Sequence, residues 1–177
     1  STLLRIADLC TGSGAVAVCL AGELPSAQIY ATDISSAALT IARGNAESHQ
    51  VAQRMQFFAG DLFDALVPRS ELRFDLIVSN PPYVRRGEIV TLAPEVSRWE
   101  PRVALDGGID GLDFYRRIAA SAPGYLAERG ALVLEVGADM ASEVSAICAD
   151  TGRYREIEVF QDYAGRDRVI VARLGKH

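Results

Sequence analysis

Short runs of aliphatic and β-branched residues alternate along this chain with longer stretches in which apolar residues recur at helical spacing. Unbroken apolar runs are typical of strands buried on both faces of a parallel sheet. The pattern therefore predicts an α/β fold. The expected strands span residues 3–9, 28–32, 55–59, 74–79, 131–136, 154–160 and 168–174. The expected helices span residues 15–24, 36–49, 63–72, 112–122 and 142–149.

Two of these helices have a well-defined apolar face, and the last two strands have a short connection. In the helix 36–49, that face is predicted to consist of Ala38, Ile41, Ala42 and Ala46. In the helix 112–122, it is predicted to consist of Leu112, Tyr115, Ile118, Ala119 and Ala122. The final strands are joined by a turn that contains Ala164 and Gly165, which predicts an antiparallel pair.

The segment from Val84 to Gly111 follows neither the helical nor the strand period and carries Pro94, Pro101 and four glycines. Connections of this length are uncommon in compact domains and are often functional lids. Val96, Trp99 and Leu105 provide apolar side chains with which the segment can pack. We therefore expect it to belong to a functional site.

Composition limits the kind of protein this can be. With 177 residues, of which 49% are hydrophobic, the chain can form one domain with its own core. Its net charge of −5 gives no general attraction to nucleic acid or to anionic membranes. Three scattered cysteines and two histidines match no metal-binding spacing, and no apolar run is long enough to cross a membrane. We expect a single, metal-free, cytoplasmic domain over residues 1–177, acting as a monomer.

A glycine-containing loop, Asp8-Leu-Cys-Thr-Gly12-Ser-Gly14, lies between the first strand and the first helix. Glycines allow the backbone to turn sharply there and to approach a ligand at the helix N-terminus. Asp33 ends the second strand, where its carboxylate could bind ribose hydroxyls, although an Asp before Ser35 could also cap a helix. The spacing of these glycines and Asp33 is compatible with a binding site for either NAD or S-adenosylmethionine. Asp8 favours the second, because an acid there could pair with the ammonium group of a methionine moiety.

Asp61 and Leu62 follow the third strand, at the same predicted edge of the sheet. Asp61 could accept a hydrogen bond from the exocyclic amine of adenine, and Leu62 could pack on the ring. The full set of expected cofactor-binding residues is Asp8, Cys10, Thr11, Gly12, Ser13, Gly14, Asp33, Ile34, Asp61, Leu62 and Asn80.

The tetrapeptide Asn80-Pro81-Pro82-Tyr83 follows the fourth strand. The two prolines restrict the backbone and remove two N–H donors, which leaves carbonyl acceptors. Asn80 and the Pro81 carbonyl could each accept one N–H of a carboxamide and direct its nitrogen toward a methyl donor, while Tyr83 packs against the flat amide. We therefore predict Asn80, Pro81, Pro82 and Tyr83 as the catalytic residues of an amide methyltransferase that has no dedicated general base.

Several motifs together resemble the peptide-chain release factor N(5)-glutamine methyltransferases, the PrmC/HemK family. They are Asp8 to Gly14, Asp33, Asn80 to Tyr83, Glu100-Pro101, Ala104 to Gly108, Asp110 to Leu112, Tyr115-Arg116, Leu134 to Gly137 and Gly165 to Val169. The resemblance implies a Rossmann-like methyltransferase fold with a mostly parallel seven-stranded sheet, an antiparallel last strand and helices on both faces. It also implies S-adenosylmethionine as donor and the glutamine of a Gly-Gly-Gln loop in release factors as acceptor. That family also has a leading helical domain, and we expect residues 1–177 not to include it.

Other functions remain to be weighed. Cys10 stands where the family commonly has glycine, and related enzymes that act on a ribosomal-protein glutamine have a similar loop. A DNA adenine methyltransferase is disfavoured, because the chain lacks a basic target-recognition region. An NAD-dependent oxidoreductase fits the glycine spacing but leaves residues 80–83 unexplained. A non-catalytic cofactor-binding module is the third possibility.

Overall fold

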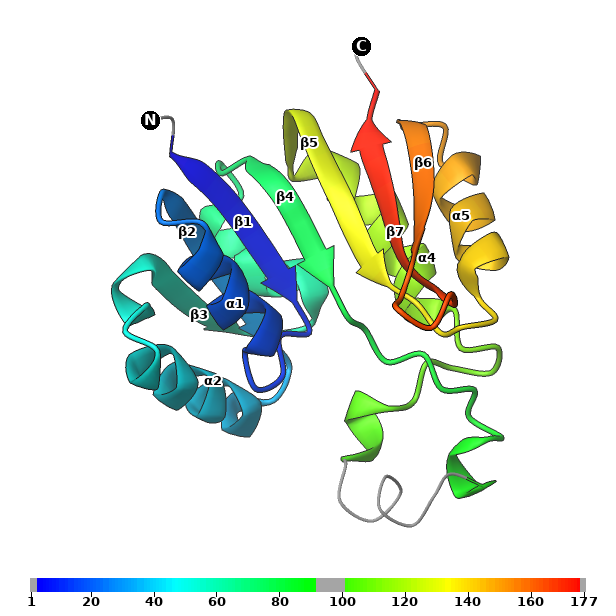
Figure 1. Cartoon of the computed structure of the whole chain (residues 1–177), viewed down its shortest axis with the longest axis horizontal. Coiled ribbons are helices and arrows are strands. Elements are labelled where there is room, and N and C mark those ends of the chain that lie inside the picture. The colour runs from blue at the N-terminus through cyan, green and yellow to red at the C-terminus, as the bar shows by residue number, and fades with distance from the viewer. Residues whose placement is uncertain (1–2, 92–100, 176–177) are drawn as a thin grey trace.

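A computed structural model describes residues 3–91 and 101–175 and contains a seven-stranded sheet. Its strands are β1 (Leu4–Leu9), β2 (Ala27–Asp33), β3 (Met55–Ala59), β4 (Phe74–Ser79), β5 (Leu126–Glu135), β6 (Tyr154–Gln161) and β7 (Asp167–Leu174), in the spatial order β3-β2-β1-β4-β5-β7-β6. Every expected strand is present, which confirms the α/β prediction (Figure 1).

The strand pairings confirm the predicted topology. The neighbouring pairs among β1 to β5 are parallel, whereas β7 lies antiparallel between β5 and β6. The last strand along the chain is therefore the antiparallel strand. This mixed sheet agrees with the mostly parallel seven-stranded sheet that the motif resemblance implies.

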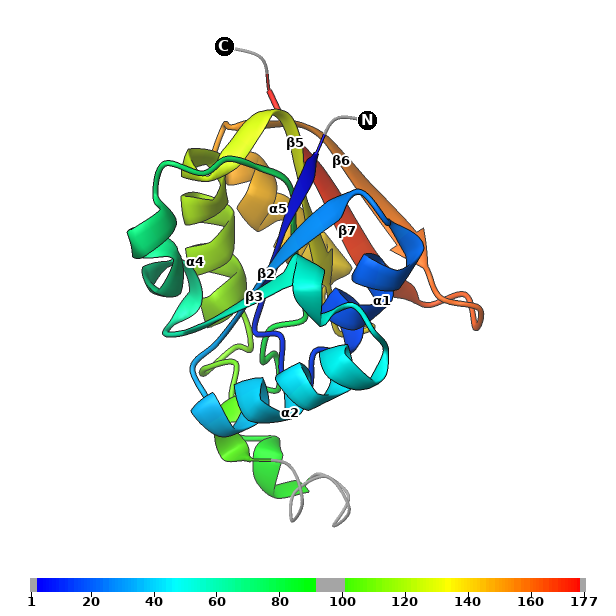
Figure 2. The same cartoon turned by 90° about the vertical axis from the view of Figure 1, so that its left-hand side faces the viewer.

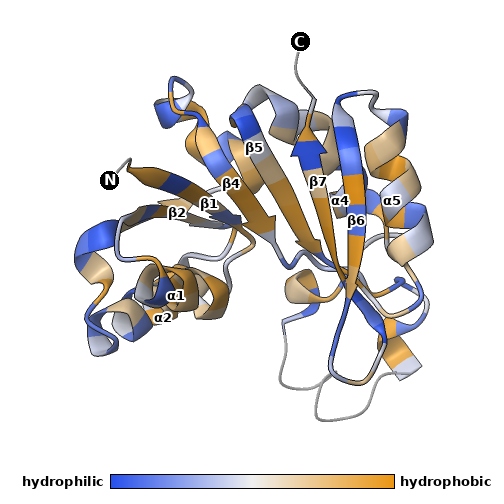
Figure 3. Cartoon of the chain, turned by 45° about the horizontal axis from the view of Figure 1, so that its top comes forward, coloured by the Kyte–Doolittle hydropathy of each residue, from blue (hydrophilic) through white to orange (hydrophobic). Residues whose placement is uncertain are grey.

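Two hydrophobic layers cover the two faces of the sheet. In β1, Ile6 belongs to one layer, and Ala7 and Leu9 belong to the other, because alternate side chains point to opposite faces. Helices α1 (Ala15–Glu23) and α2 (Ser36–Ser48) pack together near β2 and β3. Helices α4 (Asp113–Ser121) and α5 (Ala141–Asp150) pack together on the opposite face from α1 (Figure 2). Figure 3 shows long hydrophobic runs in the carboxyl halves of β4 and β5, as expected for strands covered on both sides.

The apolar face predicted for α4 is confirmed, but that of α2 was partly wrong. Leu112, Tyr115, Ile118, Ala119 and Ala122 are all buried. In α2 the buried residues are Leu39, Ala42 and Ala46, whereas Ile41 is 57% exposed. The helical stripe is rotated because the start of α2 faces a cavity rather than the core.

Two predicted elements differ in type or extent. The crossover expected as a helix over residues 63–72 is a 3-10 helix, η2 (Leu62–Arg69). Strand β5 begins at Leu126 rather than at residue 131, because its first residues pair with β4 across an irregularity: Phe74 pairs with Leu126, and Leu76 pairs with Ala131. The polar residues between these two pairs hide the start of the strand in the sequence pattern.

The long segment after β4 contains short 3-10 turns, η3 (Ile89–Thr91) and η4 (Arg102–Ala104). Leu105 is buried, as expected. Val96, Trp99 and Glu100 lie outside the described residues. Further short 3-10 turns are η1 (Ala52–Arg54) and η5 (Ala122–Gly124).

The register of the sheet brings the expected site residues to one edge. Leu9 pairs with both Thr32 and Ser79, and Asp33 pairs with Ala59. The carboxyl ends of β1 to β4 are therefore level with one another, at the lower edge in Figure 1. The segments that leave these strands must meet there, which is where ligands bind in open α/β sheets.

Candidate active site

The loop after β1 turns through three residues with left-handed backbone conformation: Cys10 (φ 57), Gly12 (φ 56) and Gly14 (φ 80). Thr11 donates its backbone N–H to Thr32 at 2.9 Å, which holds the loop against the end of β2. A methyl group added at Gly14 would lie 2.9 Å from Cβ of Ala42. Gly14 is therefore required for the close approach of α1 and α2, and it does not line the cavity described below.

Asp8 is a buried carboxylate directly before this loop. Only 1% of the residue is exposed, and Oδ2 accepts a hydrogen bond from the Thr11 hydroxyl at 2.5 Å. Burial raises the pKa of Asp8 to about 7, and the nearby Asp33 also raises it. A cation bound beside Asp8 would therefore favour loss of the carboxyl proton.

Asp33 fixes the geometry between the glycine loop and α2. Its Oδ2 accepts the backbone N–H of Gly12, and its Oδ1 accepts that of Ser35, each at 2.8 Å. The N-cap of α2 is Ser35, whose hydroxyl accepts the Ala38 N–H at 3.2 Å. Asp33 is therefore not the helix cap. Each of its oxygens has a second lone pair that can accept a hydrogen bond from a ligand.

Asp61 and Leu62 lie where β3 gives way to η2. Leu62 is 5% exposed and has a left-handed backbone (φ 49). Oδ2 of Asp61 accepts a hydrogen bond from Arg117 of α4 at 2.6 Å. The guanidinium of Arg117 also lies 5.7 Å from the centroid of the Phe114 ring. One oxygen of Asp61 is thus held by a neighbour, and the other is left for a ligand.

The segment Asn80 to Tyr83 leaves the end of β4, which the Ser79 hydroxyl ties to the Leu9 carbonyl at 2.8 Å. Asn80 is exposed, Pro81 and Pro82 are buried, and Tyr83 is half-buried against the core. The side chain of Asn80 is therefore open to solvent, whereas the two prolines that follow it are buried.

These segments surround a cavity of about 850 Å³. The structure brings together eleven of the predicted site residues along its walls: Asp8, Cys10, Thr11, Gly12, Ser13, Asp33, Ile34, Asp61, Leu62, Asn80 and Pro82. Gly14, Pro81 and Tyr83 are not among its lining residues.

Sequence reasoning missed several residues of the wall: Val16, Ile41, Pro101, Val103, Phe114 and Arg117. Val16, Ile34, Ile41 and Val103 are exposed hydrophobic residues that all face this cavity. Phe114 and Arg117 are neighbours at i,i+3 on α4, but this spacing does not by itself indicate a cavity. The combination gives apolar patches between carboxylates.

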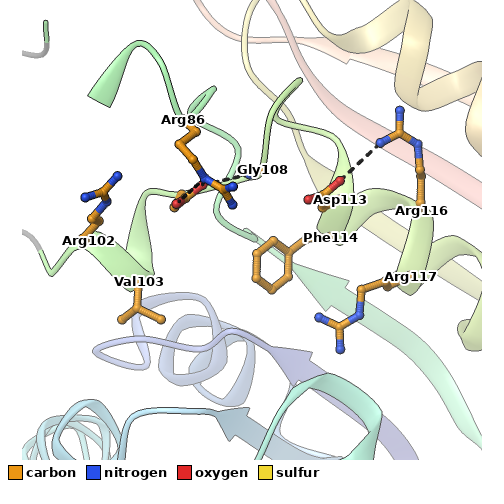
Figure 4. A pocket seen from close by; sticks show the side chains of 9 residues that line it. Arg86, Arg102, Val103, Gly108, Asp113, Phe114, Arg116 and Arg117 are labelled. Carbon is orange, nitrogen blue, oxygen red and sulfur yellow. Dashed lines mark hydrogen bonds and ion pairs between the residues drawn. The ribbon is translucent and has the colours of Figure 1, made fainter. Parts of the chain in front are cut away.

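A second, more open pocket of about 690 Å³ adjoins the first and shares Val103, Phe114 and Arg117 with it. Figure 4 shows the arginines around it, which come from the segment after β4 and from α4. Arg86 pairs with Asp106 at 3.1 Å, and Arg116 pairs with Asp110. The two pockets are therefore neighbours that share part of their walls, and the second is lined by four arginines and two aspartates.

Within residues 3–91 and 101–175, no group of three or more His, Cys, Asp and Glu side chains could hold a metal ion. No helix in the same ranges combines the length and the hydrophobicity that a membrane crossing needs.

Solved structures that share the fold include methyltransferases. A methyltransferase from Pyrococcus furiosus superposes with a TM-score of 0.70 at 17% identity, covering 99% of this chain and 78% of that one. A predicted O-methyltransferase from Agrobacterium tumefaciens has a TM-score of 0.70 at 19% identity, covering 99% and 76%. The fold is that of the S-adenosylmethionine-dependent methyltransferases.

Residues 2–96, more than half of the chain, match the family model of the methyltransferase small domain, and the chain belongs to that family. It is 47% identical over 167 residues to a release factor glutamine methyltransferase of Moorella thermoacetica, and 45% identical over 170 residues to one of Geobacter sulfurreducens. These matches cover 94% and 96% of this chain but 58% of each relative. The similarity confirms the resemblance found in the motifs.

Proposed function

We propose that the protein transfers a methyl group from S-adenosylmethionine to the side-chain amide nitrogen of a glutamine in a class 1 peptide-chain release factor. The observation that carries this proposal is the position of Asn80, which lines a carboxylate-walled cavity and leads into a proline-restricted backbone. The names of the related enzymes support the release factor as the protein substrate.

The residues of the cavity fit S-adenosylmethionine. Asp8, Asp33 and Asp61 line it, and Arg117, one of the lining residues, is already paired with Asp61. Such an excess of carboxylates favours a ligand with net positive charge and several N–H and O–H donors. Asp8 would hold the ammonium group, Asp33 the ribose hydroxyls and Asp61 the adenine amine. When bound, this cofactor supplies an electrophilic methyl group on a sulfonium centre.

The same charge distribution argues against a dinucleotide. A pyrophosphate brings negative charge, and here it would enter a cavity in which burial and the charge of Asp33 already raise the pKa of Asp8. Burial and the charges of Asp33, Asp8 and Asp61 likewise raise the pKa of the Cys10 thiol. A site for such a ligand normally presents free backbone N–H groups, yet the N–H of Gly12 is taken by Asp33. An oxidoreductase therefore becomes the weaker alternative.

The acceptor side of the cavity suits an amide. A carboxamide nitrogen is a poor nucleophile, because its lone pair is delocalised, so orientation contributes more than a base does. The Asn80 side-chain oxygen and the Pro81 carbonyl would each accept one N–H of the glutamine amide and stabilise the charge that develops on nitrogen. Pro82 would limit movement of this backbone, and Tyr83 would pack against the amide. The proton would then leave to water.

A protein substrate fits the second pocket. The polypeptide on either side of the glutamine needs a channel beside the methyl-transfer point, and the arginine-lined pocket adjoins it through Phe114 and Arg117. Guanidinium groups offer five N–H donors each, more than their present partners use, and peptide carbonyls are suitable acceptors. The net charge of −5 makes a nucleic acid substrate less favourable. We expect the protein to act as a cytoplasmic monomer.

The test is a side-by-side measurement of labelled methyl transfer from S-adenosylmethionine to purified release factor and to purified ribosomal protein. We expect labelling of the release factor at the glutamine of its Gly-Gly-Gln loop, and loss of the label when that residue is replaced by Glu. Labelling of ribosomal protein alone would contradict the proposed protein substrate but support the proposed glutamine methylation. Tight cofactor binding with no transfer to either protein would contradict the proposal.

A further inference from the structure

The backbone after the prolines is paired with a second segment of the same long connection. Val84 donates its N–H to the Leu105 carbonyl and accepts the N–H of Gly107, both at 2.9 Å. Arg86 donates to the Gly108 carbonyl at 2.8 Å. We call residues 80–83 the acceptor loop. Residues 84–86 and 105–108 form a short hydrogen-bonded ladder directly after this loop.

Two glycines of the second segment touch the backbone of the acceptor loop where a side chain could not fit. A methyl group added at Gly107 would lie 2.7 Å from Cα of Tyr83 and 2.9 Å from the Pro82 carbonyl oxygen. One added at Gly111 would collide with the Tyr83 carbonyl oxygen and lie 2.9 Å from Cε of Met140. Both glycines are buried. The contacts with Pro82 and Tyr83 are with backbone atoms, which cannot rotate away as the end of a side chain can.

The same segment also forms part of the cavity wall through Pro101, Val103 and Ala104. The acceptor loop is thus held between the end of β4, where Ser79 is tied to Leu9, and a glycine surface on its other side. Two fixed prolines give the loop its shape, but they do not fix its distance from the cavity. That distance is set by what packs behind the loop.

We propose that Gly107 and Gly111 are positioning residues for methyl transfer: they allow residues 105–111 to press against the acceptor loop and so set the place of Asn80 and the Pro81 carbonyl. This inference rests on the proposed function. The reason is geometric, since a displacement of about 1 Å at the reacting groups can reduce turnover by about 100-fold. Neither glycine lines the cofactor cavity, so we expect their substitution to leave cofactor affinity nearly unchanged.

The chain offers a matched control for each glycine. Gly107 and Gly87 both lack a left-handed backbone, but a methyl group at Gly87 meets no atom within 4 Å. Gly111 (φ 78) and Gly165 (φ 75) carry the same backbone strain when replaced, but Gly165 faces open space. Within each pair, the variants Gly107→Ala and Gly87→Ala, or Gly111→Ala and Gly165→Ala, differ in the contact with the acceptor loop.

The experiment measures kcat for methyl transfer to release factor, the dissociation constant of S-adenosylmethionine and thermal unfolding for all four variants. We expect Gly107→Ala and Gly111→Ala to lower kcat by about 100-fold, with the cofactor dissociation constant changed less than about threefold. We expect Gly87→Ala and Gly165→Ala to keep kcat within about twofold of the parent protein. Unchanged kcat in Gly107→Ala, or an equal loss of cofactor binding, would overturn the proposal. Failure of both test variants to fold would assign these glycines to stability instead.

A second readout does not depend on the substrate. Amide hydrogen exchange at Val84 and Arg86 reports the ladder directly, because their N–H groups bond to Leu105 and Gly108. We expect faster exchange at both amides in Gly107→Ala and unchanged exchange at Val84 in Gly87→Ala. If the parent protein transferred no methyl group to any release factor, the proposed function would fail, yet exchange would still decide whether Gly107 holds the loop. Protection equal to that of the parent protein would contradict the inference.

Discussion

The donor side and the acceptor side of the cavity are built in different ways. On the donor side, after β1, β2 and β3, three carboxylates line the cavity. Each has a partner within the protein: Thr11 for Asp8, Gly12 and Ser35 for Asp33, and Arg117 for Asp61. On the acceptor side, after β4, one exposed amide precedes a buried, proline-fixed backbone with glycines packed behind it.

Under the proposed function, this difference predicts that cofactor affinity and turnover depend on separate parts of the cavity wall. Side chains on the donor side can be changed singly, with a graded loss of charge-assisted hydrogen bonds. Backbone acceptors cannot be substituted, so the acceptor side depends on what surrounds it. Changes on the donor side should alter cofactor binding, and changes on the acceptor side should alter kcat.

The variant Asn80→Ala gives the strongest test of whether turnover and cofactor affinity depend on separate residues. We expect methyl transfer to fall by about 100- to 1,000-fold, because one oriented acceptor is lost, while cofactor affinity changes little. Single-turnover transfer and calorimetric titration of S-adenosylmethionine measure the two quantities. Asn80→Asp, which keeps an acceptor oxygen, should retain more activity than the Ala variant. Activity of Asn80→Ala equal to that of the parent protein would contradict the assigned role.

The converse change is Asp33→Ala on the donor side. We expect cofactor binding to weaken by about 1.5–3 kcal/mol, roughly 10- to 150-fold, through the loss of charge-assisted hydrogen bonds. Saturating cofactor should restore most of kcat. Asp64→Ala, an exposed acid of η2 outside the cavity lining, serves as the control and should bind cofactor normally. Unchanged affinity in Asp33→Ala would leave this residue with only the loop bonds to Gly12 and Ser35.

A smaller effect is expected from pH, through Asp8. The pKa of this buried carboxyl is raised to about 7, so below that pH it must release a proton to pair with an ammonium group. Cofactor affinity should therefore rise by up to about tenfold per pH unit between pH 5.5 and 7. Without cofactor the sign is opposite: a raised pKa stabilises the fold at low pH, and this stability is lost as pH rises from 3.8 through about 7. Asp8→Asn should remove both dependences, and a titration with the parent slope in that variant would contradict this account.

The smallest expected effect concerns Cys10, where the related family commonly has glycine. Its backbone is left-handed (φ 57), so Cys10→Gly relieves about 1 kcal/mol of strain but loses packing and gains chain entropy when unfolded. We expect the free energy of unfolding in urea to change by less than about 1 kcal/mol. Gln50 is exposed and also has a left-handed backbone (φ 58). The variant Gln50→Gly therefore measures the effects of backbone strain and chain entropy on stability without a loss of packing. Destabilisation of Cys10→Gly by more than about 2 kcal/mol would mean that packing dominates.

The sequence predicted the fold and the meeting of residues after β1, β2 and β3 at one cavity, because both depend on local patterns. Buried strands read as apolar runs, and Asp33 ends its strand at the expected spacing from Gly14. The cavity wall beyond these segments depends on distant contacts. Arg117 meets Asp61 across 56 positions of the chain, and no local pattern indicates such a pairing.

Two local errors have the same origin. Ile41 was assigned to the core because its spacing is helical, but at that point α2 borders the cavity and the side chain is 57% exposed. The first residues of β5 were missed because their pairing with β4 is irregular and their composition is polar. The exposure of Ile41 and the start of β5 are therefore determined by contacts with distant parts of the chain and not by the neighbouring sequence.

The insertion of β7 between β5 and β6 has a consequence for biosynthesis. Residues 167–174 are made after both of their neighbours, so a growing polypeptide presents two open strand edges until that stretch leaves the ribosome. The sheet is therefore completed only after the last of its seven strands has been made. A nascent chain stalled before that stretch should be a preferred client of chaperones that bind exposed strands.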